Sequence, residues 1–530
     1  STASPAALSR DRYLEDLAYH CYEAGMWEQA LVYAQAAAEK ATALYAQQAA
    51  IAHLTHALDA AHHLATTSLT GQATLPAQLL LARGRAHETL GDFERAQGDY
   101  ERALDAARAA QDRPLEWQCL LALGFLWTGH DYEQAEVWFR QALALAEELA
   151  DPILRARSLH RLGNWQLNTG HIQESLETFQ KALRLFEAQG DRQGMAETLE
   201  MLGSAYFFTG DPAKGVNEYF GRAIELFRSL GARQNLLSTL AARAMDVAPE
   251  TIETTYSALR TRDESLQDAE EALLLARQTN SPSAQAFVEI AMTGALFSFG
   301  EFGPAFAHAH AALRIATAIE HREWIAAANG MLGQLYLLLL APDKAIACLE
   351  AAVAEAQALG SAIWVKLLTP YLALAYVHQR AFPHAEAALT TILPRNQQAD
   401  TFFERQAARV WGELALAQGA ARQTLEIADS LIVSAPGEEQ QPIPHLLALK
   451  GSSLLALKRL EEAAGALEAA KRGAEQRQAP SILWRIHRSL ARVYHLQKRE
   501  DQAQHEGRAA REIITQLAAS LDESAGADGS

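Results

Sequence analysis

The sequence predicts an all-α fold, a right-handed superhelical solenoid of about 12 helix pairs that each span about 40 residues. Two observations lead to this prediction. A small residue after an apolar one returns every 39 or 40 residues over most of the 530-residue chain. About seven residues later comes a turn of Gly with Asp or Glu, followed by an alanine. The register runs through Gly84, Gly124, Gly163, Gly203, Ala242, Thr293, Gly333, Ala373, Gly412, Gly451 and Ala491.

One unit illustrates the predicted pair of helices. Gly91 is expected to end the first helix in a left-handed conformation because it has no Cβ atom, and Asp92 is expected to cap the second helix. Ala96 and Tyr100 then follow with helical spacing. Gly84 and Ala96 are expected where the two helices cross, so that a larger side chain would push the backbones apart.

The repeat predicts one continuous array in place of several globular domains. Residues 11–66 are expected to form one helix pair and a connector helix, out of phase with the rest, and residues 76–520 are expected to form an eleven-repeat solenoid. A single unit buries too little apolar surface to fold alone, so each unit depends on its neighbours.

The rhythm is interrupted at one place and ends at another. The step between Ala242 and Thr293 is 51 residues, so the array is expected to be irregular at about 243–268, with a loop or a lengthened helix. Residues 521–530 have no apolar face, and we expect a disordered tail there.

Composition limits the possible partners. The formal net charge is −18, which opposes binding to nucleic acid or to anionic membranes. No stretch approaches the roughly 20 apolar residues of a membrane span, so a cytoplasmic location is expected. Three cysteines lie far apart without metal or redox spacing, so we interpret them as reduced core residues. They are Cys21, Cys119 and Cys348.

The repeat resembles the tetratricopeptide repeat. The tetratricopeptide pattern consists of a small residue, a turn, an alanine, an aromatic residue or leucine, and a second alanine. Two consecutive units of this chain carry the pattern with nearly the same spacing as each other. The resemblance covers almost the whole chain, but each unit exceeds the usual 34 residues by five or six. The pattern residues are Gly333, Tyr336, Ala345, Leu349 and Ala352 in one unit, and Ala373, Tyr376, Ala385 and Leu389 in the next.

The N-terminal segment, including Leu17-Ala18-Tyr19-His20 and Glu28-Gln29-Ala30, is similar to the segment after the nucleotide-binding core of bacterial signalling ATPases. The chain therefore resembles the sensor region of a signal-transduction ATPase with numerous domains, the class that includes the maltotriose-responsive transcription activator and cyclase-linked or LuxR-type regulators. This resemblance implies that the array restrains an ATPase core until an inducer binds in the superhelix. The chain has no Gly-x-x-x-x-Gly-Lys-Ser/Thr loop and no basic recognition helix, so hydrolysis and DNA binding are expected outside these residues, in a larger protein.

The resemblance also implies where a ligand binds. Tetratricopeptide superhelices line their concave face with the first helix of each pair, at −6, −3, +1 and +4 from the small residue. Polar groups beside aromatic rings suit a sugar, a peptide or a nucleotide-like ligand, although a wetted concave face is polar in any case. The implied ligand-binding residues are Phe125, Arg157, His160, Asn164, Asn168, Glu197, Glu200, Ser204, Phe207, Phe208, Arg243 and Asp246.

A second set of concave positions is basic. Arg485, Arg488 and Arg492 lie on one face of the last full first helix, preceded in the chain by Arg409 and His445. Guanidinium groups in this arrangement can clamp a carboxylate or an acidic partner, and the alternative is a solvated end of the array. Between the two polar sets the concave positions are apolar, which favours binding of a hydrophobic helix or of another part of the same protein. They include Phe287, Ile290, Phe297, Leu337 and Leu374.

No catalytic or metal-binding set is recognised. His53, His56 and His63 share one helix, and His308 lies near His310, but no Cys or carboxylate completes a ligand pattern. We therefore expect no metal, no cofactor and no enzymatic activity in this chain. The sequence predicts a sensing domain that binds a small-molecule inducer or a peptide and acts on an ATPase core of the same protein. A constitutive scaffold for a peptide partner is the main alternative, and an accessory array of an enzyme is a third.

Overall fold

The fold is known from a computed structural model, which describes residues 13–67, 74–209, 214–245, 253–254, 260–279, 281–395, 397–435 and 442–522. Within these ranges every regular element is helical, which confirms the predicted all-α class. The elements are α2 (Leu14–Glu23), α3 (Trp27–Ala43), α4 (Gln47–Thr67), α5 (Leu75–Thr89), α6 (Phe93–Ala109), α7 (Arg113–Trp127), α8 (Tyr132–Glu148), α9 (Pro152–Asn168), α10 (Ile172–Gln189), α11 (Arg192–Thr209), the π-helix η1 (Gly215–Phe220), α13 (Gly221–Leu230), α14 (Arg233–Ala244), α16 (Arg262–Thr279), α17 (Pro282–Ser298), α18 (Phe302–Ala318), α19 (Arg322–Leu338), α20 (Pro342–Leu359), α21 (Ala362–Gln379), α22 (Phe382–Ile392), α23 (Phe402–Ala417), α24 (Ala421–Val433), α25 (Pro444–Ala456), α26 (Leu460–Gln476), α27 (Pro480–Leu496) and α28 (Glu500–Asp522).

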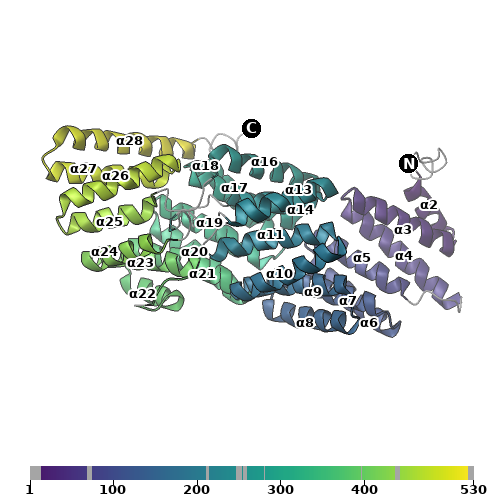
Figure 1. Cartoon of the computed structure of the whole chain (residues 1–530). Coiled ribbons are helices and arrows are strands. Elements are labelled where there is room, and N and C mark those ends of the chain that lie inside the picture. The colour runs from purple at the N-terminus through teal and green to yellow at the C-terminus, as the bar shows by residue number, and fades with distance from the viewer. Residues whose placement is uncertain are drawn as a thin grey trace.

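The helices are stacked in pairs along an elongated molecule (Figure 1). Each helix packs against the next one in the chain, and the first helix of most pairs also touches the first helix of the next pair, as α5 does with α7 and α25 with α27. The described elements form the pair α2–α3, the connector α4 and then eleven pairs from α5–α6 to α27–α28. This arrangement is the predicted solenoid of twelve pairs.

The turn within a pair follows the sequence prediction. Gly91 has a positive φ of 78°, a conformation that costs little without a Cβ atom, and it ends α5. The Asp92 side chain accepts a hydrogen bond from the backbone N–H of Arg95 at 3.3 Å and so caps α6. Both expectations for this turn are confirmed.

In six units the small residue is a glycine that packs against a ring or a leucine of the second helix. A Cβ atom on Gly84 would lie 2.5 Å from the ring of Tyr100 in α6, and Ala96 of the same helix is fully buried. Any side chain at position 84 would therefore clash with this ring. Equivalent contacts join Gly124 to Phe139, Gly163 to Phe179, Gly203 to Phe220, Gly333 to Leu349 and Gly451 to Leu467.

The π-helix η1 takes up an extra residue in one unit. Gly84 and Gly163 meet the ring sixteen positions later, whereas the ring that packs on Gly203 is Phe220, one position further along the chain. A wider helical turn accommodates one added residue without shifting the rest of the helix. The π-helix ends at Phe220, so the ring still reaches its glycine.

The solenoid is wound tightly enough that successive superhelical turns touch. Helix α9 contacts α21, α11 contacts α23, and α18 contacts α28. Ser361 Oγ donates a hydrogen bond to the backbone oxygen of Asn168 at 3.3 Å, and the Phe302 N–H donates to Ser520 Oγ at 3.2 Å. Residues about 200 positions apart are therefore neighbours.

The irregular part of the array lies between α14 and α16. Helix α14 ends at Ala244 and α16 begins at Arg262. Between them, Glu253 and Thr254 are described, and both are buried. The Thr254 backbone oxygen accepts a hydrogen bond from Arg405 at 2.7 Å, so this part of the chain contacts α23.

The boundaries at the two ends can be compared with the expected ones. Helix α4 is the connector, and α5 begins at Leu75. Helix α28 continues through Leu521 and Asp522, and residues 523–530 of the expected tail lie outside the described residues.

None of the described helices combines the length and apolar character that a membrane crossing requires. Cys119 is buried, and Cys21, Cys119 and Cys348 are all free thiols.

Candidate functional site

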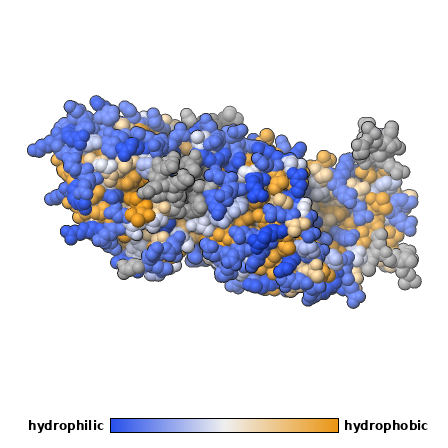
Figure 2. Space-filling model, in the orientation of Figure 1, coloured by the Kyte–Doolittle hydropathy of each residue, from blue (hydrophilic) through white to orange (hydrophobic). Residues whose placement is uncertain are grey.

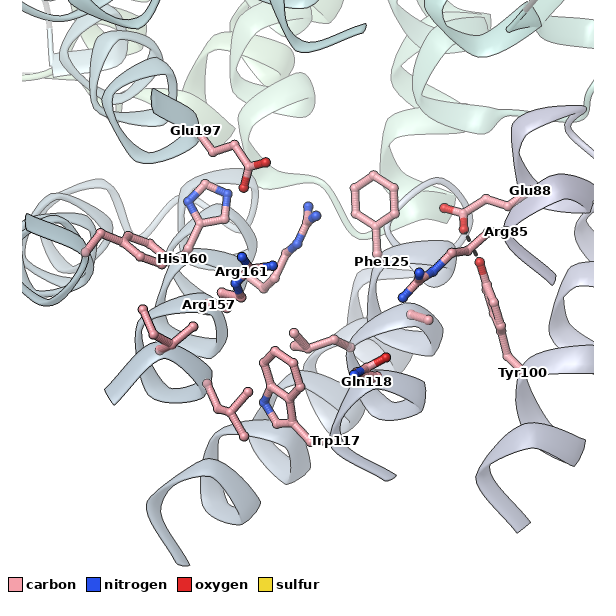
Figure 3. Close-up of a pocket in the computed structure, with 15 residues that line it drawn as sticks. Arg85, Glu88, Tyr100, Trp117, Gln118, Phe125, Arg157, His160, Arg161 and Glu197 are labelled. Atoms are coloured by element: carbon pink, nitrogen blue, oxygen red, sulfur yellow. Dashed lines mark hydrogen bonds between the residues drawn. The ribbon is translucent and has the colours of Figure 1, made fainter. Parts of the chain in front are cut away.

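A cavity of about 520 Å³ opens between the first helices of four consecutive pairs, α5, α7, α9 and α11 (Figure 3). We call it the first cavity. Second helices contribute only Tyr100 from α6 and Phe186 from α10. Its wall combines apolar residues with charged ones, and the labelled side chains of Figure 3 are Arg85, Glu88, Tyr100, Trp117, Gln118, Phe125, Arg157, His160, Arg161 and Glu197.

Arg161 lies at the centre of the first cavity. Its guanidinium carbon is 4.3 Å from the centroid of the Phe125 ring, a cation–π contact. Figure 3 shows the guanidinium between Phe125 and Glu197. Burial lowers the pKa of Arg161, while the carboxylates of Glu197 and Glu88 oppose this effect. A guanidinium keeps its proton in proteins, so Arg161 brings a positive charge into the cavity.

Two acidic residues near the first cavity are shifted toward their neutral forms. Burial raises the pKa of Glu88, which accepts a hydrogen bond from the Tyr100 hydroxyl. Burial and the neighbouring Glu197 raise the pKa of Glu200 to about 8. At neutral pH the Glu200 carboxyl is therefore mostly protonated, and the arginines are only partly neutralised by carboxylates.

His160 is a neutral wall residue. It is 7% exposed, and burial lowers its pKa to about 3, with Arg161 and Arg157 adding to the shift. Its Nδ1 lies 3.2 Å from the hydroxyl of Thr198, which itself donates to the Gly194 backbone oxygen. The Nδ1–H of His160 is therefore the donor to Thr198, and the ring is fixed in one orientation.

Four of the residues implied by the sequence meet in the first cavity. They are Phe125, Arg157, His160 and Glu197. Phe125 is 42% exposed, so its ring is available to a ligand. Arg157 also donates to Asp191 at 3.2 Å, so part of its charge is already paired.

Other implied residues lie at contacts between superhelical turns. The Phe207 ring is 5.6 Å from that of Phe402, and the Phe208 ring is stacked 5.7 Å from that of Phe403. Asn168 donates its side-chain amide to Asn164, and its backbone oxygen is bound by α21. These residues hold the solenoid together and do not line the first cavity.

The remaining implied residues have local partners. Arg243 forms two hydrogen bonds with Asp268, at 2.7 and 2.8 Å, and so joins α14 to α16. Ser204 Oγ donates to the backbone oxygen of Glu200, which is itself buried behind the cavity wall. Asp246 lies outside the described residues.

Sequence reasoning missed several wall residues, and part of the signal was present. Arg85 and Glu88 stand at +1 and +4 from Gly84, and Gln118 stands at −6 from Gly124, so the same register extended by two units includes them. Trp117 and Arg161 fall outside that register, and only the structure brings them to the cavity. The missed residues are Arg85, Glu88, Tyr100, Trp117, Gln118, Leu121, Ala122, Ile153, Leu154, Arg161 and Phe186.

A second cavity of about 340 Å³ lies on the first helices of the C-terminal half. Arg485 and Arg488 line it, whereas Arg492 is exposed and does not. The part of the wall that was expected to be apolar includes Phe297, Leu337 and Leu374, so these residues and the arginines share one cavity. Among the described residues no group of three or more His, Cys, Asp or Glu side chains has an arrangement that fits a metal ion.

Comparison with protein families identifies two matching segments. A model described as tetratricopeptide repeat matches residues 154–229, and another with the same description matches residues 77–109. A search of curated proteins found no match.

Solved structures with a similar arrangement of helices include two Rap proteins and an APC/C hetero-tetramer. The chain is 15% identical to the Rap conjugation gene regulator of the plasmid pLS20 in complex with a Phr peptide, with a TM-score of 0.44 and coverage of 56% of this chain and 75% of that chain. It is 12% identical to a Rap protein complexed with competence and sporulation factor, with a TM-score of 0.35 and coverage of 84% and 99%.

The third structure is the APC/C hetero-tetramer Cut9-Hcn1, at 13% identity and a TM-score of 0.34, with 93% of this chain and 96% of that chain covered. Similarity at this level carries no information on ligands. The two family matches, together with the stacked helix pairs, confirm the predicted solenoid type. The chain therefore contains tetratricopeptide repeats, matched over residues 77–109 and 154–229, in an all-helical solenoid.

Proposed function

We propose that this chain is a sensing domain that binds a peptide or a small-molecule inducer in the first cavity. The observation that supports the proposal is the convergence of Arg85, Arg161 and Glu197 with the rings of Trp117 and Phe125 in one cavity of about 520 Å³. Cavities of this size, with an apolar wall and a few polar groups, are typical of ligand sites.

The charges favour an anionic or zwitterionic ligand with an aromatic or apolar part. Arg85 and Arg161 are positively charged, while the nearby Glu88 is shifted toward its neutral form. The exposed Phe125 ring offers a flat apolar face, and the mostly buried Trp117 ring forms part of the apolar wall. A negative group bound by two arginines in a partly buried site accepts charge-assisted hydrogen bonds, which are stronger than neutral ones and fix the orientation of the ligand.

We further propose that binding is passed on through the shape of the array. The first cavity is shared by four helix pairs, so a ligand that touches all of them favours one curvature of the solenoid. In this proposal the curvature controls an ATPase and oligomerisation switch elsewhere in a multidomain signalling ATPase. Support comes from the N-terminal segment that is similar to the region after such ATPase cores.

The binding step is tested by thermal shift with sugars, nucleotides and peptides. Ligand at 100 times its Kd adds about 2.7 kcal/mol to the free energy of unfolding, which raises the melting temperature. The stabilisation is expected to disappear in Arg161→Gln and in Phe125→Ala. It should persist in Arg184→Gln, a matched exposed arginine on the second helix α10. A ligand whose effect survives both cavity variants binds elsewhere and contradicts the proposal.

A constitutive scaffold for a peptide partner is the second candidate. One observation favours it: contacts between superhelical turns, such as the Phe208–Phe403 stack, restrain the curvature of the array. Small-angle X-ray scattering separates the two candidates. A change in the radius of gyration on ligand binding supports the sensor, and binding with an unchanged radius supports the scaffold.

A further inference from the structure

The second cavity has a charged end and an apolar wall. Its residues come from the first helices α17, α19, α21, α23, α25 and α27, with Glu253 from the segment between α14 and α16. No described residue lines both this cavity and the first one. Figure 2 shows hydrophobic residues gathered near α25, in the part of the molecule that holds this cavity.

The charged end has an excess of positive charge. Among the described lining residues, three arginines, Arg409, Arg485 and Arg488, accompany two carboxylates, those of Glu253 and Glu413. Arg409 Nη2 lies 2.9 Å from Glu253 Oε2, so one arginine already holds a carboxylate. Burial raises the pKa of Glu253, and protonation of this group would only increase the positive excess.

The two histidines of this cavity add no charge at neutral pH. Burial lowers the pKa of His378 to about 4, and Arg485 and Arg409 contribute to the shift. Burial and the same kind of neighbours, beginning with Arg409, keep the pKa of His445 well below its usual value. Among the described residues, none forms an ion pair with Arg485 or Arg488. Burial lowers the pKa of Arg485, and the charges of Glu413 and Glu253 oppose this shift without a direct ion pair.

Three buried polar atoms of residues that line this cavity have no hydrogen-bond partner among the described residues. They are Gln334 Oε1, His445 Nδ1 and Arg485 Nε. Gln334 is only 4% exposed. Most buried polar groups in proteins are paired, so a cluster of unpaired ones beside a cavity indicates a polar ligand. An acceptor for Arg485 and an N–H or O–H donor for Gln334 would satisfy two of them.

The cavity also has apolar lining residues, on α17, α19 and α21. Phe297 is fully buried, Leu337 is 4% exposed, and Leu374 lies beside them. The Trp484 ring lines the same cavity and stacks under the guanidinium of Arg485, at 5.3 Å. A ligand that fits both ends is amphipathic, with a carboxylate on the arginines and an aliphatic group on this wall.

We propose that the second cavity binds a hydrophobic monocarboxylate that also carries an amide N–H. This is the chemistry of an N-acylated leucine-like amino acid and of the hydrophobic C-terminus of a peptide. The carboxylate binds Arg485 and Arg488, the N–H donates to Gln334, and the aliphatic group packs on Leu337 and Leu374. The site is separate from the first cavity, so it does not rest on the function proposed for that cavity.

The test measures binding of N-acetyl-L-leucine and of its neutral amide by isothermal titration calorimetry. The acid is expected to bind, and the amide at least tenfold more weakly. Arg485→Gln should weaken binding of the acid at least tenfold. Arg492→Gln is the matched control. Arg492 is exposed on the same helix, and its substitution removes one positive charge, as Arg485→Gln does. Arg161→Gln in the first cavity should also leave this binding unchanged.

The outcomes separate clearly. Stronger binding of a short peptide that ends in a free leucine carboxylate than of N-acetyl-L-leucine identifies a peptide end as the ligand, and equal binding identifies the acylated amino acid. Both support the site. The proposal is overturned if neither N-acetyl-L-leucine nor the peptide binds, or if N-acetyl-L-leucine and its amide bind equally well. Circular dichroism of Arg485→Gln, and a second variant Gln334→Leu that loses affinity without changing net charge, distinguish loss of the site from loss of the fold.

Discussion

At the scale of a residue, a missing Cβ atom lets the two helices of a pair approach closely in the units whose glycine packs on the second helix. A Cβ on Gly124 would lie 2.5 Å from the Phe139 ring, and Phe139 is fully buried. The ring cannot move away without displacing its own neighbours, because protein cores are close-packed. In six units the glycine of the register therefore marks the place where a ring or a leucine of the second helix packs.

We expect Gly124→Ala to lower the free energy of unfolding by about 1–3 kcal/mol, the usual cost of overpacking. Gly98→Ala is the control, because Gly98 is in a helix and a Cβ there meets nothing within 4 Å. That change should stabilise the protein by up to about 1 kcal/mol through helix propensity. Urea unfolding of both variants checks the prediction, which fails if the two substitutions shift the midpoint in the same direction.

Which cavity residues the sequence reveals depends on how each side chain reaches the cavity. Phe125, His160 and Glu197 occupy first-helix positions that the resemblance to tetratricopeptide repeats implies for the concave face. Arg161 reaches the cavity because it stacks on Phe125 from a different helix, a contact that no single-helix pattern contains. Phe208 occupies the same inner surface but packs on a turn nearly 200 residues away.

At the scale of elements, the connection α7–α8 packs on the connection α18–α19 of the next superhelical turn. A Cβ on Gly129 would lie 2.8 Å from His321 Nε2, and the rings of His130 and His321 are 6.3 Å apart. Burial lowers the pKa of His130 to about 4, with Arg322 adding to the shift, and that of His321 to about 3. Both rings are neutral in the folded protein at neutral pH.

We expect acidification to weaken this contact. Because the folded pKa values lie below the unfolded value of about 6.5, the unfolded chain binds more protons, and stability is lost as the pH falls from about 6.5 toward 4. Glu323 acts in the opposite direction, because burial raises its pKa to about 7. Its contribution to stability is lost as the pH rises from about 4.5 to 7. The urea concentration at the unfolding midpoint should decrease when the pH is lowered from 7 to 4. The decrease should be smaller in His321→Gln. An equal slope in both proteins would show that this histidine does not titrate on unfolding.

At the scale of the whole molecule, the solenoid is a coil whose turns lean on each other. A fixed period predicts that pairs stack, and it predicts the length of the array, because both depend on neighbours in the chain. It does not predict the pitch, which depends on small rotations summed over several units. The contacts of α9 with α21 and of α11 with α23 are a consequence of that pitch. For this reason the sequence placed Phe207 and Phe208 in a ligand site, whereas the structure places them between turns.

The contact between turns can be measured with a double-mutant cycle on Phe208 and Phe403, whose rings are stacked with centroids 5.7 Å apart. Each single change to Ala removes the same ring pair, so the double variant should lose less stability than the sum of the two single variants, with a coupling of about 0.5–1.5 kcal/mol. Phe125→Ala combined with Phe403→Ala is the control pair, and its effects should be additive because Phe125 contacts Arg161 in the first cavity. Small-angle X-ray scattering of the double variant at Phe208 and Phe403 should show a larger radius of gyration. The reason is that this ring pair is one of the contacts that hold successive superhelical turns together. Additive stability effects together with an unchanged radius would mean that curvature is set by adjacent units alone, and that ligand-driven changes of curvature need not break any contact between turns.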